Sequence, residues 1–221
     1  MERLRGGYTN RTSRSYGGRI VKTYEGTDAL ARLELEHACL TNLTGLLPLP
    51  TVIEFDRDTY TLTMLEVPGT HGQDLMNGAQ SLDILRQLGS LHSQLTSIDP
   101  STVPQLGGTG KVIVHGDFGP QNTLFDGGVL TALIDWEFAH IGQPLEDLAW
   151  TEWIVRMHHP DHRDGLAELF NAAGVEPAWH DRHATMVAGC SSLLGRVQRL
   201  GMPTAVDLWK ERLSATENWT E

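Results

Sequence analysis

One spacing constrains the fold of this chain more than any other: an aspartate, an asparagine five positions later, and a second aspartate beyond a glycine turn. Asp117 follows the short β-branched run Lys111–Val114, and Asn122 opens the next predicted strand. The turn Asp126–Gly128 then returns the chain, and Asp135 stands at the end of the returning strand. Because the paired strands of a hairpin bring their ends together, Asn122 and Asp135 are expected to lie close to each other, near Asp117.

The chemistry of these three side chains suits phosphoryl transfer. Magnesium prefers hard oxygen donors and bridges the phosphates of a nucleotide, so Asn122 and Asp135 are predicted to hold Mg²⁺. A carboxylate beside an acceptor hydroxyl orients that hydroxyl and takes its proton, which makes Asp117 the predicted catalytic base. The chain is therefore predicted to use ATP or GTP as a phosphoryl donor.

The N-terminal part of the chain predicts a small β-rich lobe with one helix. The strand-like runs are 12–16, 19–24, 52–55 and 59–65, and the first two flank a glycine pair that is typical of a tight hairpin. Leucines recur at helical spacing over residues 27–44. Lys22 lies on the second strand, where it can neutralise phosphate oxygens, and an acidic residue of the helix, Glu34 or Glu36, can hold Lys22 in place.

A boundary between two lobes is predicted at the run Glu66–Gly69. Proline and glycine do not continue a strand comfortably, so this run breaks the last strand of the first lobe. The predicted domains are residues 1–66 and residues 67–221. Residues 81–96 and nearly everything after residue 141 have helical patterns, which makes the fold class α+β.

The composition excludes several classes of function. With 17 basic and 28 acidic residues the formal charge is −11, which argues against nucleic-acid binding and mildly favours a cationic ligand. No apolar run is long enough to cross a bilayer and the N-terminal residues are polar, so no membrane association and a cytoplasmic location are expected. Cys39 and Cys190 are expected to be buried thiols. The oligomeric state stays open.

These motifs, taken in order, resemble the aminoglycoside phosphotransferase family of small-molecule kinases, which includes choline and homoserine kinases. The resemblance covers nearly the whole chain, including the leucine–histidine helix at Leu88–His92 and the segment Gly142–Ala149 after the metal aspartate. It implies a protein kinase-like two-lobed fold. Because only about residues 97–110 separate the leucine–histidine helix from the catalytic strand, it also implies a compact variant of that fold.

The same resemblance assigns roles in nucleotide binding near the N-terminus. The run Gly6–Asn10 is similar to the family's glycine-rich loop over the nucleotide phosphates, which implies that Thr9 and Asn10 contact the nucleotide. The family's pattern of a glutamate followed by an apolar pair matches Leu35–Leu40 and favours Glu36 over Glu34 as the partner of Lys22. The resemblance also implies that the backbone of Glu66 and Val67 meets the base of the nucleotide.

A candidate acceptor site follows the second aspartate in the sequence. Glu137, Glu146, Glu152 and Trp153 are predicted to form an acidic, aromatic-walled surface that suits a cationic or amine-bearing acceptor. An alternative is that the acidic residues complement the start of a helix and the tryptophan belongs to the core.

The same motifs are compatible with a protein that has lost catalysis. A catalytically impaired nucleotide-binding pseudokinase or scaffold of the same fold is the main alternative, motivated by the short segment before Lys111. A protein kinase is disfavoured, because the metal motif is Asp135–Glu137 rather than Asp-Phe-Gly and no Ala-Pro-Glu segment follows. His115 is expected to anchor the catalytic loop by hydrogen bonds, and His158–His162 is expected to be a solvated loop rather than a metal site.

Overall fold

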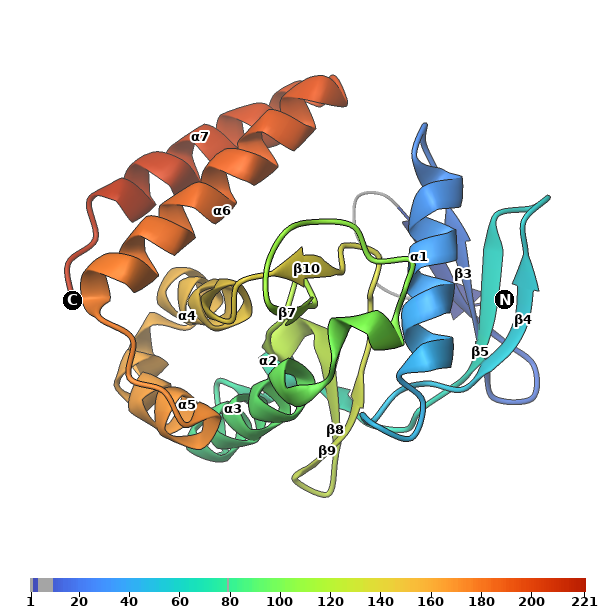
Figure 1. The fold of residues 1–221 in the computed structure, drawn as a ribbon, viewed down its shortest axis with the longest axis horizontal. Helices are drawn as coiled ribbons and strands as arrows, with labels where there is room; N and C mark the ends of the chain where they lie inside the picture. Colours follow the sequence, from blue (N-terminus) through green and yellow to red (C-terminus); the bar gives the residue numbers. More distant parts are fainter. Residues whose placement is uncertain (1, 4–9, 79) are drawn as a thin grey trace.

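The computed structural model describes residues 2–3, 10–78 and 80–221, and it has a mixed α+β architecture with a small sheet at one end (Figure 1). The sheet is antiparallel and has the strand order β1-β2-β3-β5-β4. Its elements are β1 (Glu2–Arg3), β2 (Asn10–Ser15), β3 (Arg19–Tyr24), β4 (Val52–Asp56), β5 (Thr61–Leu65) and the helix α1 (Ala29–Asn42). Gly17 and Gly18, both with positive φ, make the tight turn between β2 and β3.

The rest of the chain is mostly helical, with short strands that carry the catalytic loop. Its strands are β6 (Thr70–His71), β7 (Val112–Val114), β8 (Thr123–Asp126), β9 (Val129–Leu133) and β10 (His140–Gly142). Its α-helices are α2 (Gly72–Leu75), α3 (Ser81–Ser97), α4 (Leu145–His158), α5 (Leu166–Ala173), α6 (Trp179–Arg199) and α7 (Pro203–Glu217). Its 3₁₀ turns are η1 (Pro100–Thr102), η2 (Pro120–Asn122) and η3 (Pro160–Gly165).

The elements differ from the sequence-based expectation in a few places. Asn122 ends the 3₁₀ turn η2 instead of opening a strand, and β8 begins one residue later. Leu82, in the first turn of α3, is 50% exposed although the helical pattern of residues 81–96 begins there. The strands β6 and β10 were not expected. They are only two and three residues long, and they exist through pairing with β8 and β7.

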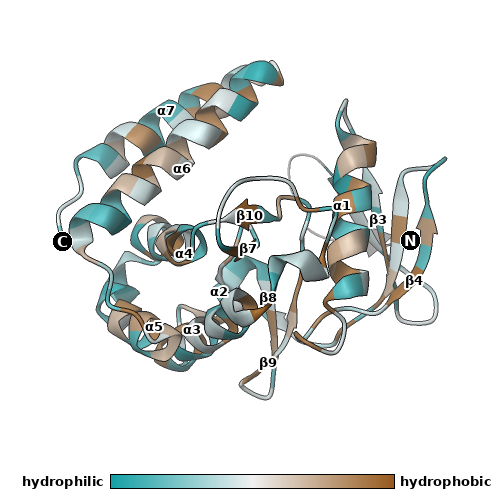
Figure 2. Ribbon diagram, viewed as in Figure 1, coloured by the Kyte–Doolittle hydropathy of each residue, from teal (hydrophilic) through white to brown (hydrophobic). Residues whose placement is uncertain are grey.

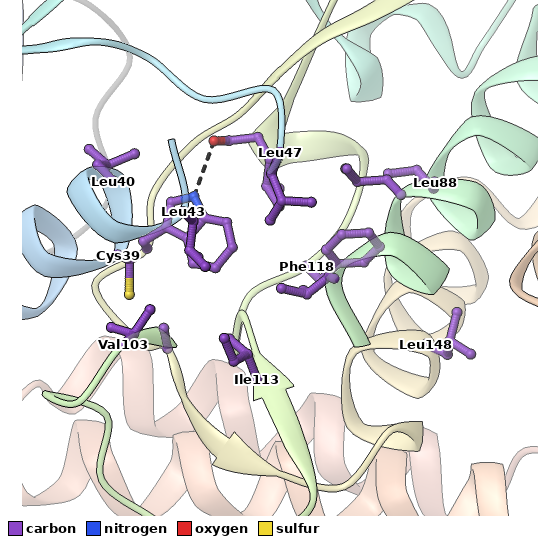
Figure 3. Close-up of a cluster of buried hydrophobic side chains, with 14 of the residues drawn as sticks. Cys39, Leu40, Leu43, Leu47, Leu88, Val103, Ile113, Phe118 and Leu148 are labelled. Atoms are coloured by element: carbon purple, nitrogen blue, oxygen red, sulfur yellow. Dashed lines mark hydrogen bonds between the residues drawn. The ribbon is translucent and has the colours of Figure 1, made fainter. Parts of the chain in front are cut away.

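One apolar core continues from α1 into the helical part of the chain. Leu43, which caps the C-terminus of α1, Leu88 of α3 and Ile113 of β7 belong to the same cluster of buried side chains (Figure 3). The strand β7, Val-Ile-Val, is apolar and buried near the centre of the molecule, whereas α6 and α7 alternate apolar and polar residues along their length (Figure 2). The predicted boundary at residues 66 and 67 stays a prediction.

A second cluster of buried side chains joins α4 to the α6–α7 hairpin, which lies at the end of the molecule opposite the small sheet (Figure 1). Trp153, Met186, Cys190 and Trp209 are among its members. Cys39 and Cys190 are both free and buried, and burial raises the pKa of the Cys39 thiol to about 12. Among the described residues, no helix is both long and apolar enough to cross a membrane.

Close packing of α3 against α5 predicts a stability effect at Gly89. A Cβ atom at this position would lie 2.2 Å from the carbonyl oxygen of Leu169, a backbone atom that cannot turn away. We expect Gly89→Ala to lower the free energy of unfolding by about 1–3 kcal/mol. The control is Gly195→Ala in α6, where the nearest atom is the end of the flexible Arg199 side chain at 3.5 Å. That variant should gain stability of about 0.5–1 kcal/mol from helix propensity. Urea unfolding measures both, and equal effects would contradict the packing argument.

Candidate active site

The loop that follows β7 is held in place by the carboxylate of Asp147 and by the ring of His115. The carboxylate of Asp147, at the start of α4, accepts hydrogen bonds from the backbone N–H groups of His115 (2.7 Å) and Gly116 (3.0 Å). The His115 ring accepts from the N–H of Asp117 through Nδ1 (3.3 Å), so its Nε2 carries a proton and donates to the carbonyl of Ile134 (3.0 Å). Burial lowers the pKa of His115 to about 4, so the ring is neutral and serves as the structural anchor expected of it.

The carboxylate of Asp117 accepts hydrogen bonds from three side chains. Its Oδ1 accepts from the indole Nε1 of Trp150 (2.8 Å) and from the amide of Gln121 (3.2 Å), and its Oδ2 accepts from the amide of Asn122 (2.8 Å). Burial, and then the charge of Asp135, raise the pKa of Asp117 to about 7 in spite of these donors. A carboxylate with a pKa near neutrality is well matched to proton transfer. The sequence did not indicate that Trp150 or Gln121 contacts Asp117.

Lys22 connects the small sheet to the second aspartate. Its Nζ lies 2.5 Å from Glu36 Oε2 and 2.5 Å from Asp135 Oδ1, and the Tyr24 hydroxyl donates to the same Glu36 oxygen. Burial by itself lowers the pKa of Lys22, but the charges of Asp135 and Glu36 outweigh it and raise that pKa. Asp135 has a φ of +71°, a left-handed conformation that few residues other than glycine, asparagine and aspartate adopt.

Glu137 lies on the same side of the site as Lys22. Its Oε2 accepts from Asn10 (2.7 Å) and from Arg32 of α1 (2.6 Å), and Arg32 also donates to the Asn10 side-chain oxygen (2.7 Å). This places Glu137 in a buried network with a residue of the expected nucleotide-binding run. Arg32 was not indicated by the sequence, since one arginine within an amphipathic helix carries no signal of its own.

The oxygen donors in this region fit a magnesium ion. One carboxylate oxygen from each of Glu36, Asp135 and Glu137 lies within 4.8 Å of the others, and the Asp135 side chain is 32% exposed. Asn122 donates both to the backbone oxygen and to Oδ2 of Asp117 through its amide nitrogen, which leaves its amide oxygen as a possible ligand. Hard oxygen ligands of this kind are those that Mg²⁺ prefers.

Glu66 and Val67, which are predicted to contact the nucleotide base, directly follow β5 of the small sheet. The backbone N–H of Glu66 donates to the carbonyl of Gly18 (2.8 Å), and its carboxylate pairs with Arg14. Glu66 and the partly buried Val67 are thereby held beside the β2–β3 hairpin. Thr9, with Gly6 and Gly7, lies outside the described residues.

The four residues of the expected acceptor surface have separate, mostly internal partners. Glu146 pairs with His140 (2.9 Å), and Glu137 pairs with Arg32 as described above. Trp153 is 1% exposed. Fully buried Glu152 contacts two arginines at the back of α4. These partners are Arg156 (2.8 Å) and Arg182 (2.6 Å), which also line a cavity of about 560 Å³ that none of the predicted site residues lines. The three glutamates therefore have partners within the protein, and the binding role of the four residues stays a prediction.

Comparisons with known proteins agree with this geometry. The sequence model of the phosphotransferase enzyme family matches residues 1–111 and 108–184. A search of curated protein sequences found no significant match.

Several solved structures share the fold. The GDP complex of wild-type aminoglycoside 2'-phosphotransferase-IIIa has a TM-score of 0.78 at 16% identity, over 98% of this chain and 91% of that chain. A thermostable mutant of aminoglycoside phosphotransferase APH(4)-Ia has a TM-score of 0.71 at 17% identity, over 97% and 92%. The streptomycin–ATP–APH(2")-IIa ternary complex has a TM-score of 0.67 at 12% identity, over 86% and 82%. The chain therefore belongs to the phosphotransferase enzyme family and has the fold of its small-molecule kinases.

Proposed function

We propose that this protein transfers the γ-phosphoryl group of ATP or GTP to a hydroxyl group of a small molecule. The observation that carries the proposal is the position of Lys22 Nζ, 2.5 Å from both Glu36 and Asp135. These three residues come from β3, α1 and the end of the β8–β9 hairpin. Asp117 and Asn122 are hydrogen-bonded to each other, and the backbone N–H of Ile134, next to Asp135, donates to the Asn122 carbonyl (2.9 Å). A set of this kind supplies a phosphate-binding cation, metal ligands and a base.

Each residue has a distinct task in the proposed reaction. Asp117 takes the proton of the acceptor hydroxyl as the acceptor oxygen bonds to the γ-phosphorus and the bond from that phosphorus to the β–γ bridging oxygen breaks. Lys22 binds phosphate oxygens and is oriented by Glu36. Asn122 and Asp135 would hold Mg²⁺, which neutralises charge on the phosphates when bound.

The remaining contacts concern the nucleotide and the acceptor. The backbone of Glu66 and Val67 binds the base, and Thr9 and Asn10 lie over the phosphates. The acceptor we propose is amine-bearing, in the manner of aminoglycosides, choline or homoserine. The formal charge of −11 and the aromatic ring of Trp150 beside Asp117 support this class.

The test is nucleotide consumption by the purified protein with Mg²⁺, against a panel of kanamycin, choline, homoserine and sugar amines. We expect one acceptor class to stimulate turnover with both ATP and GTP tried as donors, and EDTA to abolish it. Tight binding of Mg·ATP or Mg·GTP without phosphorylation of any panel member would instead favour a non-catalytic nucleotide-binding protein of the same fold.

A further inference from the structure

We propose that Trp150 is a positioning residue for the catalytic base, and that it leaves Oδ2 of Asp117 as the oxygen that takes the acceptor's proton. This inference rests on the proposed function only in the role given to Asp117. Its basis is the hydrogen bond of 2.8 Å from the indole Nε1 of Trp150, on α4, to Oδ1 of Asp117.

A count of hydrogen bonds distinguishes the two oxygens of Asp117. A carboxylate offers about four lone-pair positions, two on each oxygen. Trp150 and Gln121 both donate to Oδ1, whereas Asn122 is the single side-chain donor to Oδ2 among the described residues. The remaining lone pair is therefore on Oδ2, and the hydroxyl proton passes to that oxygen as the acceptor attacks phosphorus.

Of the two side chains that donate to Oδ1, Trp150 is the one that can act only as a hydrogen-bond donor. An indole N–H can only donate. Gln121 can present either end of its amide, its donor distance is longer at 3.2 Å, and its Oε1 is buried without a hydrogen-bond partner. Without Trp150, the Asp117 carboxylate can rotate and the free lone pair no longer points in one direction.

The indole ring of Trp150 is itself held by α4, α6 and α7. It stacks on Trp153 at 4.6 Å with an interplanar angle of 4°, and Trp153 donates to the hydroxyl of Thr216 in α7 (2.8 Å). Gly189 of α6 packs beside the ring, where an added Cβ would lie 3.3 Å from Trp150 Cε3. The α6–α7 hairpin thus holds the indole ring of Trp150 in place, and this ring in turn orients the carboxylate of Asp117.

The variant Trp150→Phe tests the proposal, because phenylalanine keeps an aromatic ring and removes the N–H donor. The matched control is Trp209→Phe, since the Trp209 ring belongs to the same aromatic cluster (6.2 Å from the Trp150 ring) and is not among the side chains that donate to Asp117 in the described part of the chain. With Mg·ATP and the most active acceptor of the panel, we expect Trp150→Phe to lower kcat by about 10- to 100-fold and to leave KM for ATP within about twofold. Trp209→Phe should change both constants by less than about threefold. Equal losses of kcat in the two variants would reduce Trp150 to a packing residue.

A second measurement needs no acceptor. In the ¹⁵N–¹H spectrum, the indole signals of Trp150 and Trp209 are assigned by their absence from Trp150→Phe and Trp209→Phe. In Asp117→Ala the chemical shift of the Trp150 indole signal should change, and that of the Trp209 signal should not. If the chemical shift of the Trp150 indole signal is unchanged in Asp117→Ala, the proposal is overturned, whatever the activities of the variants are. If the Trp150 indole signal responds to Asp117→Ala as expected but Asp117→Asn keeps full turnover, the proposed role of Asp117 fails instead.

Discussion

Asp117→Asn should lower acceptor-dependent turnover by about 10³-fold, the largest effect that we expect from a single substitution. The amide cannot take the proton of the acceptor hydroxyl. It also cannot reproduce the hydrogen bonds of the carboxylate, because Trp150, Gln121 and Asn122 all donate to Asp117 and one end of the new amide is itself a donor. Binding of Mg·ATP should survive, since Lys22 and Asp135 are unchanged.

The measurement is kcat together with the dissociation constant of Mg·ATP, for Asp117→Asn and for Asp126→Asn. Asp126 is exposed at the turn between β8 and β9, so the control makes the same chemical change away from the site. Loss of kcat with intact nucleotide binding supports a catalytic base. Turnover equal to that of Asp126→Asn would remove Asp117 from the mechanism.

Asp135→Asn should abolish most of the Mg²⁺-dependent activity while leaving the fold intact. Asp135 has a φ of +71°, and asparagine is among the residues that tolerate this left-handed conformation. The substitution therefore removes a negative ligand without forcing the backbone to move. Because a metal ion contributes several kcal/mol of charge stabilisation, we expect a loss of about 10²- to 10³-fold in turnover.

The loss in Asp135→Asn should be accompanied by a changed dependence on Mg²⁺. Because a neutral amide is a weaker ligand for Mg²⁺ than a carboxylate, the concentration of Mg²⁺ for half-maximal rate should rise. Lys22 loses its ion pair with Asp135 but keeps Glu36 as its partner. Asp58→Asn, at an exposed turn, is the control. An unchanged Mg²⁺ titration curve in Asp135→Asn would argue against a metal-binding role.

Local sequence signals predicted much of the fold. The glycine pair between β2 and β3, the leucines of α3 and the strand–turn–strand pattern of β8 and β9 each depend on residues that are near neighbours in the chain, and these elements were found where expected. The short strands β6 and β10 were missed because two or three residues have no periodicity to detect. Their existence depends on partners far along the chain.

The predicted chemistry had a similar limit. The spacing of Asp117, Asn122 and Asp135 is encoded within one hairpin and its flanking loop, so the sequence indicated it directly. The partners of those side chains come from distant elements: Trp150 lies on α4 and Arg32 on α1. A hydrogen bond between residues 33 positions apart leaves no local pattern.

The sequence by itself determined which functional groups the protein offers and the order of the elements that carry them, because residue type, helical and strand periodicity and turn chemistry are local properties. Only the tertiary structure decided which of those groups meet. It paired Lys22 with Asp135 across 113 positions, neutralised Glu152 with two arginines, and turned an indole toward the predicted base. The physical reason is that burial leaves each polar group to find a partner, and the partner is whichever group the packing of helices and strands places beside it.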